Sequence, residues 1–145
     1  MKETGFHIQA IYFDDDLLEL RVWGSSGRFA GEADIYVGLE DIPNMAKALH
    51  GFPSKNDDNI EFKLGNFNPN NAGGGVHLIF QSSVTGKVAV EAIIQHDPRL
   101  WNGHLGNVQF TVLVEPAAID NFVSMLEKLG SIKRGAAILC GLTTG

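Results

Sequence analysis

Hydrophobic and polar residues alternate along most of this chain, and a period of two residues is typical of half-buried β-strands. The alternation is clearest in Leu64–Gln95, where the even positions from Val76 to Phe80 and from Val88 to Ile94 are apolar. Similar patterns predict further strands over Phe6–Phe13, Leu17–Trp23, Arg28–Val37, Ile60–Phe67 and Leu105–Glu115. In the first of these we expect Phe6, Ile8, Ala10 and Tyr12 to share one side.

The two strands within Leu64–Gln95 predict an antiparallel hairpin with a defined register. Directly opposed residues point to the same side of a sheet, so we expect Phe80 to pair with Val90 and Leu78 with Ala92. This register leaves a three-residue loop that ends at Gly86. A type I turn followed by a bulge needs a left-handed residue there, which glycine supplies without strain.

Two segments have the helical spacing of apolar residues instead. We expect a short helix over Leu39–Leu49, capped by Asp41, and a second over Pro116–Leu129, ended by Gly130. Neither helix falls between Ile60 and Leu113, so the strands in that region are joined by turns and pair antiparallel.

The elements together predict a single α+β domain over residues 1–130. We expect mainly an antiparallel β-sandwich or curved sheet of about seven strands with two short helices. Residues 131–145 form a small, apolar, glycine-containing tail. This tail is either flexible or adds a strand over Ala136–Leu142.

The charge of the chain narrows the range of partners. The 145 residues carry a formal net charge of −6, with a sequence pI near 5.2. No basic stripe is present, so we expect no nucleic-acid partner, whereas a basic protein partner is compatible with this charge. The sequence has no apolar run of about 18 residues, which predicts no membrane association. The single cysteine and the polar N-terminus favour a cytoplasmic location.

The residue types and spacings of common catalytic and metal sites are missing. Gly73–Gly75 opens a strand, whereas a phosphate-binding loop opens a helix. The acids Asp14–Asp16 lack the spacing of a calcium loop, and the five histidines lack zinc-ligand spacing. Cys140 has no base near it in sequence, and no serine elbow occurs. We therefore predict a non-enzymatic protein without metal or cofactor.

Two groups of polar residues are the candidate binding surfaces. His77 and Glu91 fall on the polar side of the predicted hairpin, where they could form a histidine–carboxylate pair. The second group follows the hairpin in a loop, and it offers three potential ligands and one aromatic platform. Its members are His96, Asp97, Trp101 and His104. The alternative interpretation is an ordinary connecting loop whose Trp101 fills the end of the sandwich.

Several short motifs resemble those of a bacterial family of small proteins whose function is unassigned. They span roughly two-thirds of the chain, from Asp34 to Leu129. They are Tyr36-Val37-Gly38-Leu39, Leu49-His50-Gly51-Phe52-Pro53, Leu64-Gly65-Asn66-Phe67, Ala72-Gly73-Gly74-Gly75-Val76, and Val114-Glu115 with Ala117-Ala118-Ile119-Asp120-Asn121-Phe122-Val123. Similar proteins occur among the small β-rich immunity proteins of bacterial toxin systems. The resemblance supports membership of a family more than an activity, and it carries over no catalytic residue.

Three functional hypotheses follow from these observations. The leading one is a protein-binding module, such as an immunity-type inhibitor of a basic toxin, held by electrostatic complementarity. The alternative is a small-ligand or carbohydrate binder that uses Trp23, Trp101 and the loop 96–104. The third is a homo-oligomer joined by strand edges or by the apolar tail.

Overall fold

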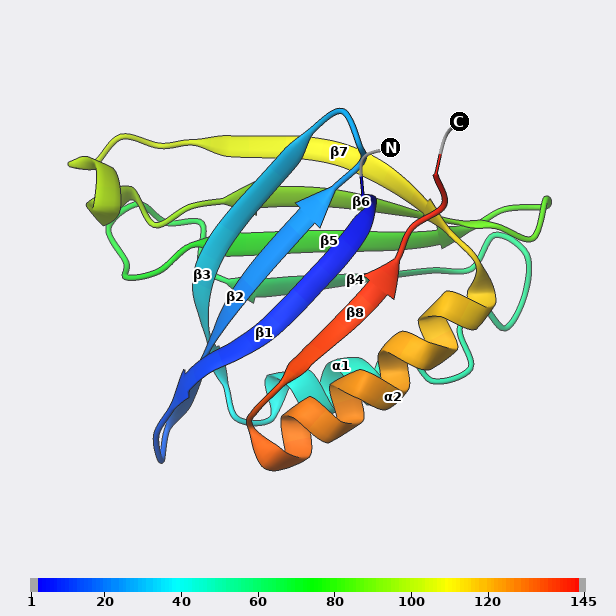
Figure 1. The fold of residues 1–145 in the computed structure, drawn as a ribbon, viewed down its shortest axis with the longest axis horizontal. Helices are drawn as coiled ribbons and strands as arrows, with labels where there is room; N and C mark the ends of the chain where they lie inside the picture. The colour runs from blue at the N-terminus through cyan, green and yellow to red at the C-terminus, as the bar shows by residue number, and fades with distance from the viewer. Residues whose placement is uncertain (1–2, 144–145) are drawn as a thin grey trace.

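Two four-stranded antiparallel sheets and two helices make up the structure, a computed structural model that describes residues 3–143 apart from the Trp101 side chain (Figure 1). Sheet A has the order β3-β2-β1-β8, with β1 (Gly5–Phe13), β2 (Leu17–Ser25), β3 (Ala30–Gly38) and β8 (Ala136–Cys140). Sheet B has the order β4-β5-β6-β7, with β4 (Asn59–Gly65), β5 (Gly75–Ser82), β6 (Val88–Gln95) and β7 (Asn107–Val114). The predicted α+β class with antiparallel sheets is confirmed.

The described chain contains eight strands where the sequence predicted about seven. The additional strand is β8, which forms within the tail and pairs antiparallel with β1. Ala137 and Leu139 are fully buried by this pairing. Their alternation with Ala136, Ile138 and Cys140 is a short version of the pattern that defines the other strands. Of the two alternatives left open for the tail, the extra strand is the one observed.

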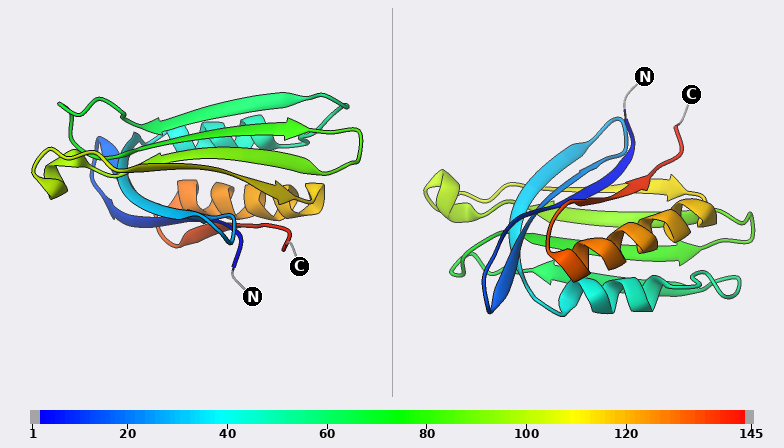
Figure 2. Two further views of the ribbon diagram at one scale, coloured as in Figure 1. Left: turned by 90° about the horizontal axis from the view of Figure 1, so that it is seen from above. Right: turned by 60° about the horizontal axis from the view of Figure 1, so that its bottom comes forward.

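The two sheets pack face to face with their strands crossing at a steep angle (Figure 2). The crossing is centred on β3, which contacts all four strands of sheet B. The backbone N–H of Gly74 donates to the carbonyl of Asp34 in β3 at 2.9 Å, so at this point the layers meet through backbone. Phe6 of sheet A stacks on Phe110 of sheet B, with ring centroids 6.0 Å apart. The inward-facing residues of both sheets therefore form one continuous core.

The helices α1 (Asp41–Leu49) and α2 (Pro116–Ile132) pack against each other along the side of the molecule that carries β4 and β8 (Figures 1 and 2). Both helices are amphipathic, and their apolar sides are buried in the same core as the sheets. They cover the part of the core where sheet A no longer lies over sheet B.

Two details of the helix ends differ from the sequence prediction. Asp41 is not the cap of α1; Glu40 occupies that position, and the Asp41 carboxylate instead accepts from the backbone N–H of Gly38 at 2.8 Å. Gly130 lies inside α2, where a Cβ would meet the Pro43 ring of α1 at 3.0 Å. The close approach of the helices explains this glycine. The helix ends at Ile132, and the cap residue Lys133, which has a left-handed backbone, donates its N–H to the Leu129 carbonyl.

The β5–β6 hairpin has the predicted register, with Phe80 opposite Val90 and Leu78 opposite Ala92. The Ser83 N–H donates to the Lys87 carbonyl, which closes the three-residue loop before Lys87. Gly86 has the expected left-handed conformation, with φ of 85°. The local turn residues and the hydrophobic pattern therefore specify the same hairpin.

A β-bulge in β1 changes the side on which Tyr12 lies. Up to Ala10, which pairs with Leu20, the even residues of β1 face the core. The register shifts between Ala10 and Tyr12, so Tyr12 pairs with the outward-facing Glu19. An extra residue in one strand reverses the facing of the residues beyond it. The prediction that Tyr12 lies on the side of Phe6 and Ile8 was therefore wrong.

Neither helix is long and apolar enough to cross a membrane within the part of the chain that the structure describes.

Candidate functional site

The predicted pair of His77 with Glu91 does not form. His77 Nε2 donates instead to Glu61 Oε2 of β4 at 2.7 Å, and Gln109 of β7 donates to Glu91 at 3.0 Å. Both contacts cross to outer strands of sheet B, because β5 and β6 each have a second neighbour besides one another. The hydrogen bond from His77 lowers the pKa of Glu61, and burial opposes that change. The two predicted residues thus belong to separate surface pairs.

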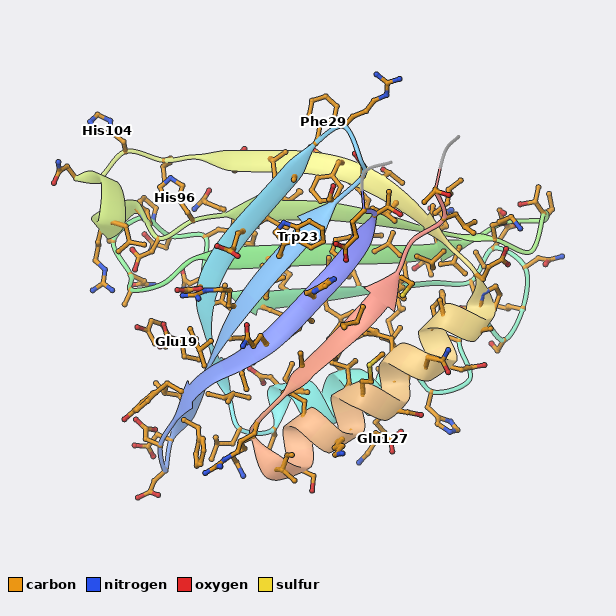
Figure 3. All side chains as sticks on the ribbon, in the orientation of Figure 1. Glu19, Trp23, Phe29, His96, His104 and Glu127 are labelled. Atoms are coloured by element: carbon orange, nitrogen blue, oxygen red, sulfur yellow. The ribbon has the colours of Figure 1, made fainter. Side chains whose placement is uncertain are left out.

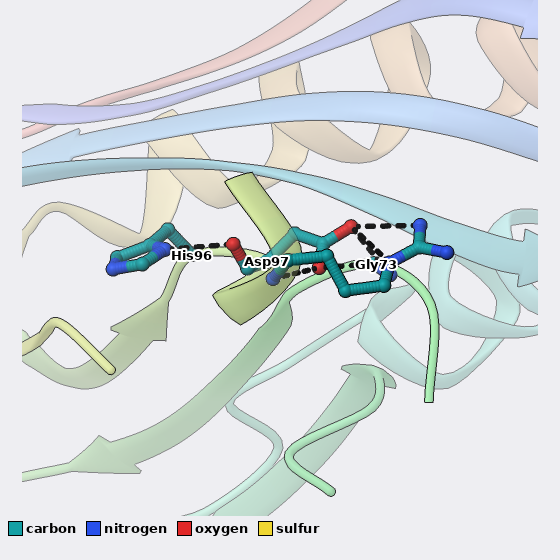
Figure 4. Close-up of polar contacts among 4 residues, drawn as sticks. Gly73, His96 and Asp97 are labelled. Atoms are coloured by element: carbon teal, nitrogen blue, oxygen red, sulfur yellow. Dashed lines mark hydrogen bonds and ion pairs between the residues drawn. The ribbon is translucent and has the colours of Figure 1, made fainter. Parts of the chain in front are cut away.

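The loop after β6 is organised by the buried carboxylate of Asp97 (Figure 4). Asp97 Oδ2 accepts from the backbone N–H of Gly73 at 3.0 Å, and Oδ1 accepts from the backbone N–H of Arg99 at 3.0 Å. The Arg99 guanidinium also donates to Oδ2 at 3.0 Å. Asp97 caps the short 3-10 helix η1 (Pro98–Trp101) and joins it to the loop before β5. These donors occupy the carboxylate, so its observed role is to hold two loops together.

The partners of Asp97 also set its protonation. The Arg99 guanidinium, followed by the backbone donors, holds the pKa of Asp97 below its ordinary value of 3.8, against burial, which raises it. A carboxyl group whose pKa is lowered by folding stabilises the protein above its unfolded pKa. That stabilisation is lost as the pH falls through the folded pKa.

We expect Asp97→Asn to lower the free energy of unfolding at neutral pH by about 1–3 kcal/mol, because buried donors lose a charged acceptor. The difference from wild type should shrink as the pH falls below about 3.8, because the unfolded chain takes up the proton there while the folded carboxylate, with its lowered pKa, still resists it. Urea denaturation over a pH series measures the difference in the free energy of unfolding between the wild type and the variant. Asp15→Asn, at an exposed turn residue, is the control and should show no such difference. A loss that is constant with pH would assign the effect to shape alone.

The remaining predicted loop residues do not converge on one another. His96 Nδ1 contacts the backbone carbonyl of Asp97 at 2.9 Å, while His104 is exposed further along the loop (Figure 3). The Trp101 side chain lies outside the described residues. Across residues 3–143, no three histidine, cysteine or acidic side chains are grouped closely enough to hold a metal ion. Trp23 lies on sheet A, away from this loop, and the ligand-binding hypothesis for 96–104 stays a prediction.

The outer face of sheet A carries a set of polar and aromatic residues, of which the sequence indicated only Trp23 as a candidate for binding (Figure 3). The register arranges these residues in three rows that run across the strands. The first row is Ile138, His7, Trp23 and Glu32; the second is Ala136, Gln9, Arg21 and Asp34; the third is Tyr12, Glu19 and Tyr36. We call this set the outer face of sheet A.

The outer face of sheet A is acidic. Its carboxylates are Glu19, Glu32 and Asp34, and its one arginine is Arg21. Arg21 is paired with Asp34 through two hydrogen bonds, of 2.9 and 3.1 Å. The negative charge of Glu19, followed by burial, raises the pKa of Tyr36. Glu19 and Glu32 therefore give this face its uncompensated negative charge.

Aromatic rings accompany these acids. Trp23 is half-buried against His7, with ring centroids 5.0 Å apart in an edge-to-face arrangement. Tyr12 and Tyr36 are 56% and 36% exposed on either side of Glu19. Aromatic residues are enriched at the centres of protein interfaces, because they bury a large area with little loss of conformational freedom. The combination fits recognition of another protein.

The alternation of Glu32, Asp34 and Tyr36 in the sequence was the signal that could have indicated this face. The strand pattern alone placed these three on one side of β3. The addition of Tyr12 could not be foreseen in this way, because it depends on the bulge in β1.

No protein-family model, curated protein or solved structure matches this chain at a significant level. The resemblance of its motifs to a bacterial family therefore stays a prediction.

Proposed function

We propose that this chain is a non-enzymatic protein-binding module of the immunity type, which inhibits a basic toxin by binding it with the outer face of sheet A. The observation that carries the proposal is the placement of Glu19 and Glu32 among exposed and half-exposed aromatic rings on one sheet face. The net charge of −6 adds a long-range attraction for a basic partner. Trp23 and the two tyrosines supply the apolar contact area.

Charged and aromatic side chains have different roles at such an interface. Complementary charges speed the encounter and select against acidic competitors, whereas buried aromatic side chains slow dissociation. An inhibitor that must capture a toxin quickly and hold it benefits from both properties. The rigid sheet presents them without a loss of backbone entropy on binding.

The experiment is co-expression of this chain with each basic protein encoded beside its gene, in a host whose growth that protein arrests. We expect the wild-type chain to restore growth with one such neighbour and to bind it with nanomolar affinity. The double variant Glu19→Lys/Glu32→Lys should weaken binding by about a hundredfold and abolish the rescue, because like charges then face each other.

A matched control separates the face from the overall charge. Glu61→Lys/Glu127→Lys makes the same change in net charge on sheet B and on α2, away from the outer face of sheet A. We expect this variant to retain rescue. Equal losses in the two double variants would overturn the assignment of the surface. A chain that binds and neutralises none of the neighbouring proteins would overturn the proposed function.

A further inference from the structure

We propose that Tyr12, Glu19 and Tyr36 form a binding site for one arginine side chain of a basic partner protein. The inference rests on the proposed function, and it names the chemical group that the outer face of sheet A recognises. It begins from the third row of that face, in which Tyr12 pairs with Glu19 and Glu19 pairs with Tyr36. One carboxylate thus stands between two phenol rings on three adjacent strands.

The bulge in β1 is what creates this arrangement. Without the register shift at Ile11, Tyr12 would continue the inward series of Phe6, Ile8 and Ala10. The shift leaves Tyr12 56% exposed and directly opposite Glu19. Exposing a tyrosine forgoes the hydrophobic stabilisation of burying its ring. Bulges are frequent beside binding sites, where they re-aim a side chain in this manner.

The spacing of the row suits a planar cation. Adjacent strands are about 4.8 Å apart, so the backbones that carry Tyr12 and Tyr36 are separated by about 10 Å. A flat group stacked between two rings needs about 7 Å between the ring planes, at the usual contact distance of about 3.5 Å on each side. A small rotation of the exposed Tyr12 side chain can supply that gap. Glu19 then lies at the base of the gap between the two rings, within reach of the cation's N–H groups.

Two members of this row, Tyr36 and Glu19, are supported by the rest of the fold. Tyr36 packs over Gly73, where a Cβ would lie 2.7 Å from its ring. Gly73 is in turn held by the carboxylate of Asp97. The loop that Asp97 organises therefore fixes the ring of Tyr36. Leu18 and Leu20, which flank Glu19 in β2, are buried in the core and hold its backbone in place.

Two arginines of this region are already paired with other carboxylates, while a third, Arg134, lines a pocket together with Tyr12. Arg21 binds Asp34 and Arg99 binds Asp97, and no ion pair within residues 3–143 includes Glu19. A cation from a partner would therefore find Glu19 without displacing either of these pairs. Guanidinium fits better than ammonium, because it is planar, stacks on aromatic faces and donates two parallel hydrogen bonds to one carboxylate.

The test uses two capped heptapeptides as probes, one of arginine and one of lysine, titrated into the 145-residue chain. Two-dimensional NMR locates the contact, and calorimetry gives the dissociation constants at low salt. We expect the arginine peptide to shift the amide resonances of Tyr12, Glu19 and Tyr36 more than any others. We expect it to bind about tenfold more tightly than the lysine peptide.

Two variants and two matched controls test the residues themselves. Tyr12→Ala and Glu19→Gln should each raise the dissociation constant of the arginine peptide by about tenfold. Phe29→Ala removes an exposed ring at the turn between β2 and β3, and Glu127→Gln removes a carboxylate of α2; both should change the dissociation constant less than about twofold. Unchanged melting temperatures confirm that the variants are folded. Three results would each overturn the proposed arginine site. They are resonance shifts centred elsewhere, equal affinity for the two peptides, and equal effects of variants and controls.

The outcome is separable from that of the proposed function. If the arginine peptide binds at Tyr12, Glu19 and Tyr36 while no neighbouring gene product is neutralised, the arginine site is supported and the immunity-type function is wrong. If a neighbouring toxin is neutralised, but Tyr12→Ala and Glu19→Gln leave its dissociation constant unchanged, the proposed function is supported and the arginine site is wrong.

Discussion

Replacement of Phe80 with alanine is expected to lower the free energy of unfolding by about 3–5 kcal/mol. Phe80 is fully buried on β5, and its ring meets Phe52 and Phe62 edge to face, with centroids 6.2 and 5.9 Å away. The substitution removes the apolar contacts of the ring and leaves a cavity between sheet B and the segment after α1. Rigid β-strands on both sides limit how far that cavity can collapse. Urea denaturation followed by circular dichroism measures the change.

Phe29→Ala is the matched control for this prediction. Phe29 is 58% exposed at the turn between β2 and β3, so its ring loses little on truncation (Figure 3). We expect a change within about 0.5 kcal/mol. A loss at Phe80 no larger than that at Phe29 would contradict the packing of the two sheets around β5.

Gly74→Ala is expected to destabilise the fold by about 3 kcal/mol, at the upper end of the usual range for overpacking. A Cβ at this position would lie 2.3 Å from the carbonyl oxygen of Gln95 and 3.1 Å from the Cβ of Ala33. The first neighbour is backbone of β6 and the second belongs to β3, so neither can rotate away. The backbone N–H of Gly74 would also be displaced from the Asp34 carbonyl that it now bonds. The melting temperature and the urea midpoint should both fall.

Gly86→Ala provides the comparison for a glycine that is needed for conformation alone. Nothing lies within 4 Å of a Cβ at Gly86, and its φ of 85° is the only obstacle to a side chain. We expect a loss of about 1 kcal/mol there. If Gly74→Ala were tolerated as well as Gly86→Ala, the backbone contact between the two sheets would be wrong.

The sequence was sufficient for the parts of the fold that depend on neighbours along the chain. The register of the β5–β6 hairpin followed from the alternation and from Gly86, because a short turn leaves few ways to align its strands. The second helix was found from its apolar spacing, but its end was misplaced by three residues, from Leu129 to Ile132. Gly130 has the appearance of a helix stop, and only the presence of Pro43 on the packed helix shows its other purpose.

The candidate site was harder to predict, because its contacts join distant segments. Which carboxylate meets His77 depends on the order of strands in sheet B, and the sequence identified only the hairpin partner. Asp97 holds a backbone group 24 positions away, at Gly73, in a loop with no recognisable pairing signal. Tyr12 was misassigned because a bulge at an apolar residue, Ile11, leaves the hydrophobic pattern unbroken. In each case the deciding interaction is tertiary.

The pairing of β1 with β8 has a consequence for how the protein is made. Thr4 donates through its hydroxyl to the carbonyl of Leu142, 138 positions away, so a segment made before sheet B is completed by a segment made after it. Until β8 has left the ribosome, one edge of β1 exposes backbone groups that could pair with another chain. The strands of sheet B, by contrast, follow one another directly and can pair as they emerge. Sheet A can therefore be completed by β8 only after the strands of sheet B have been synthesised.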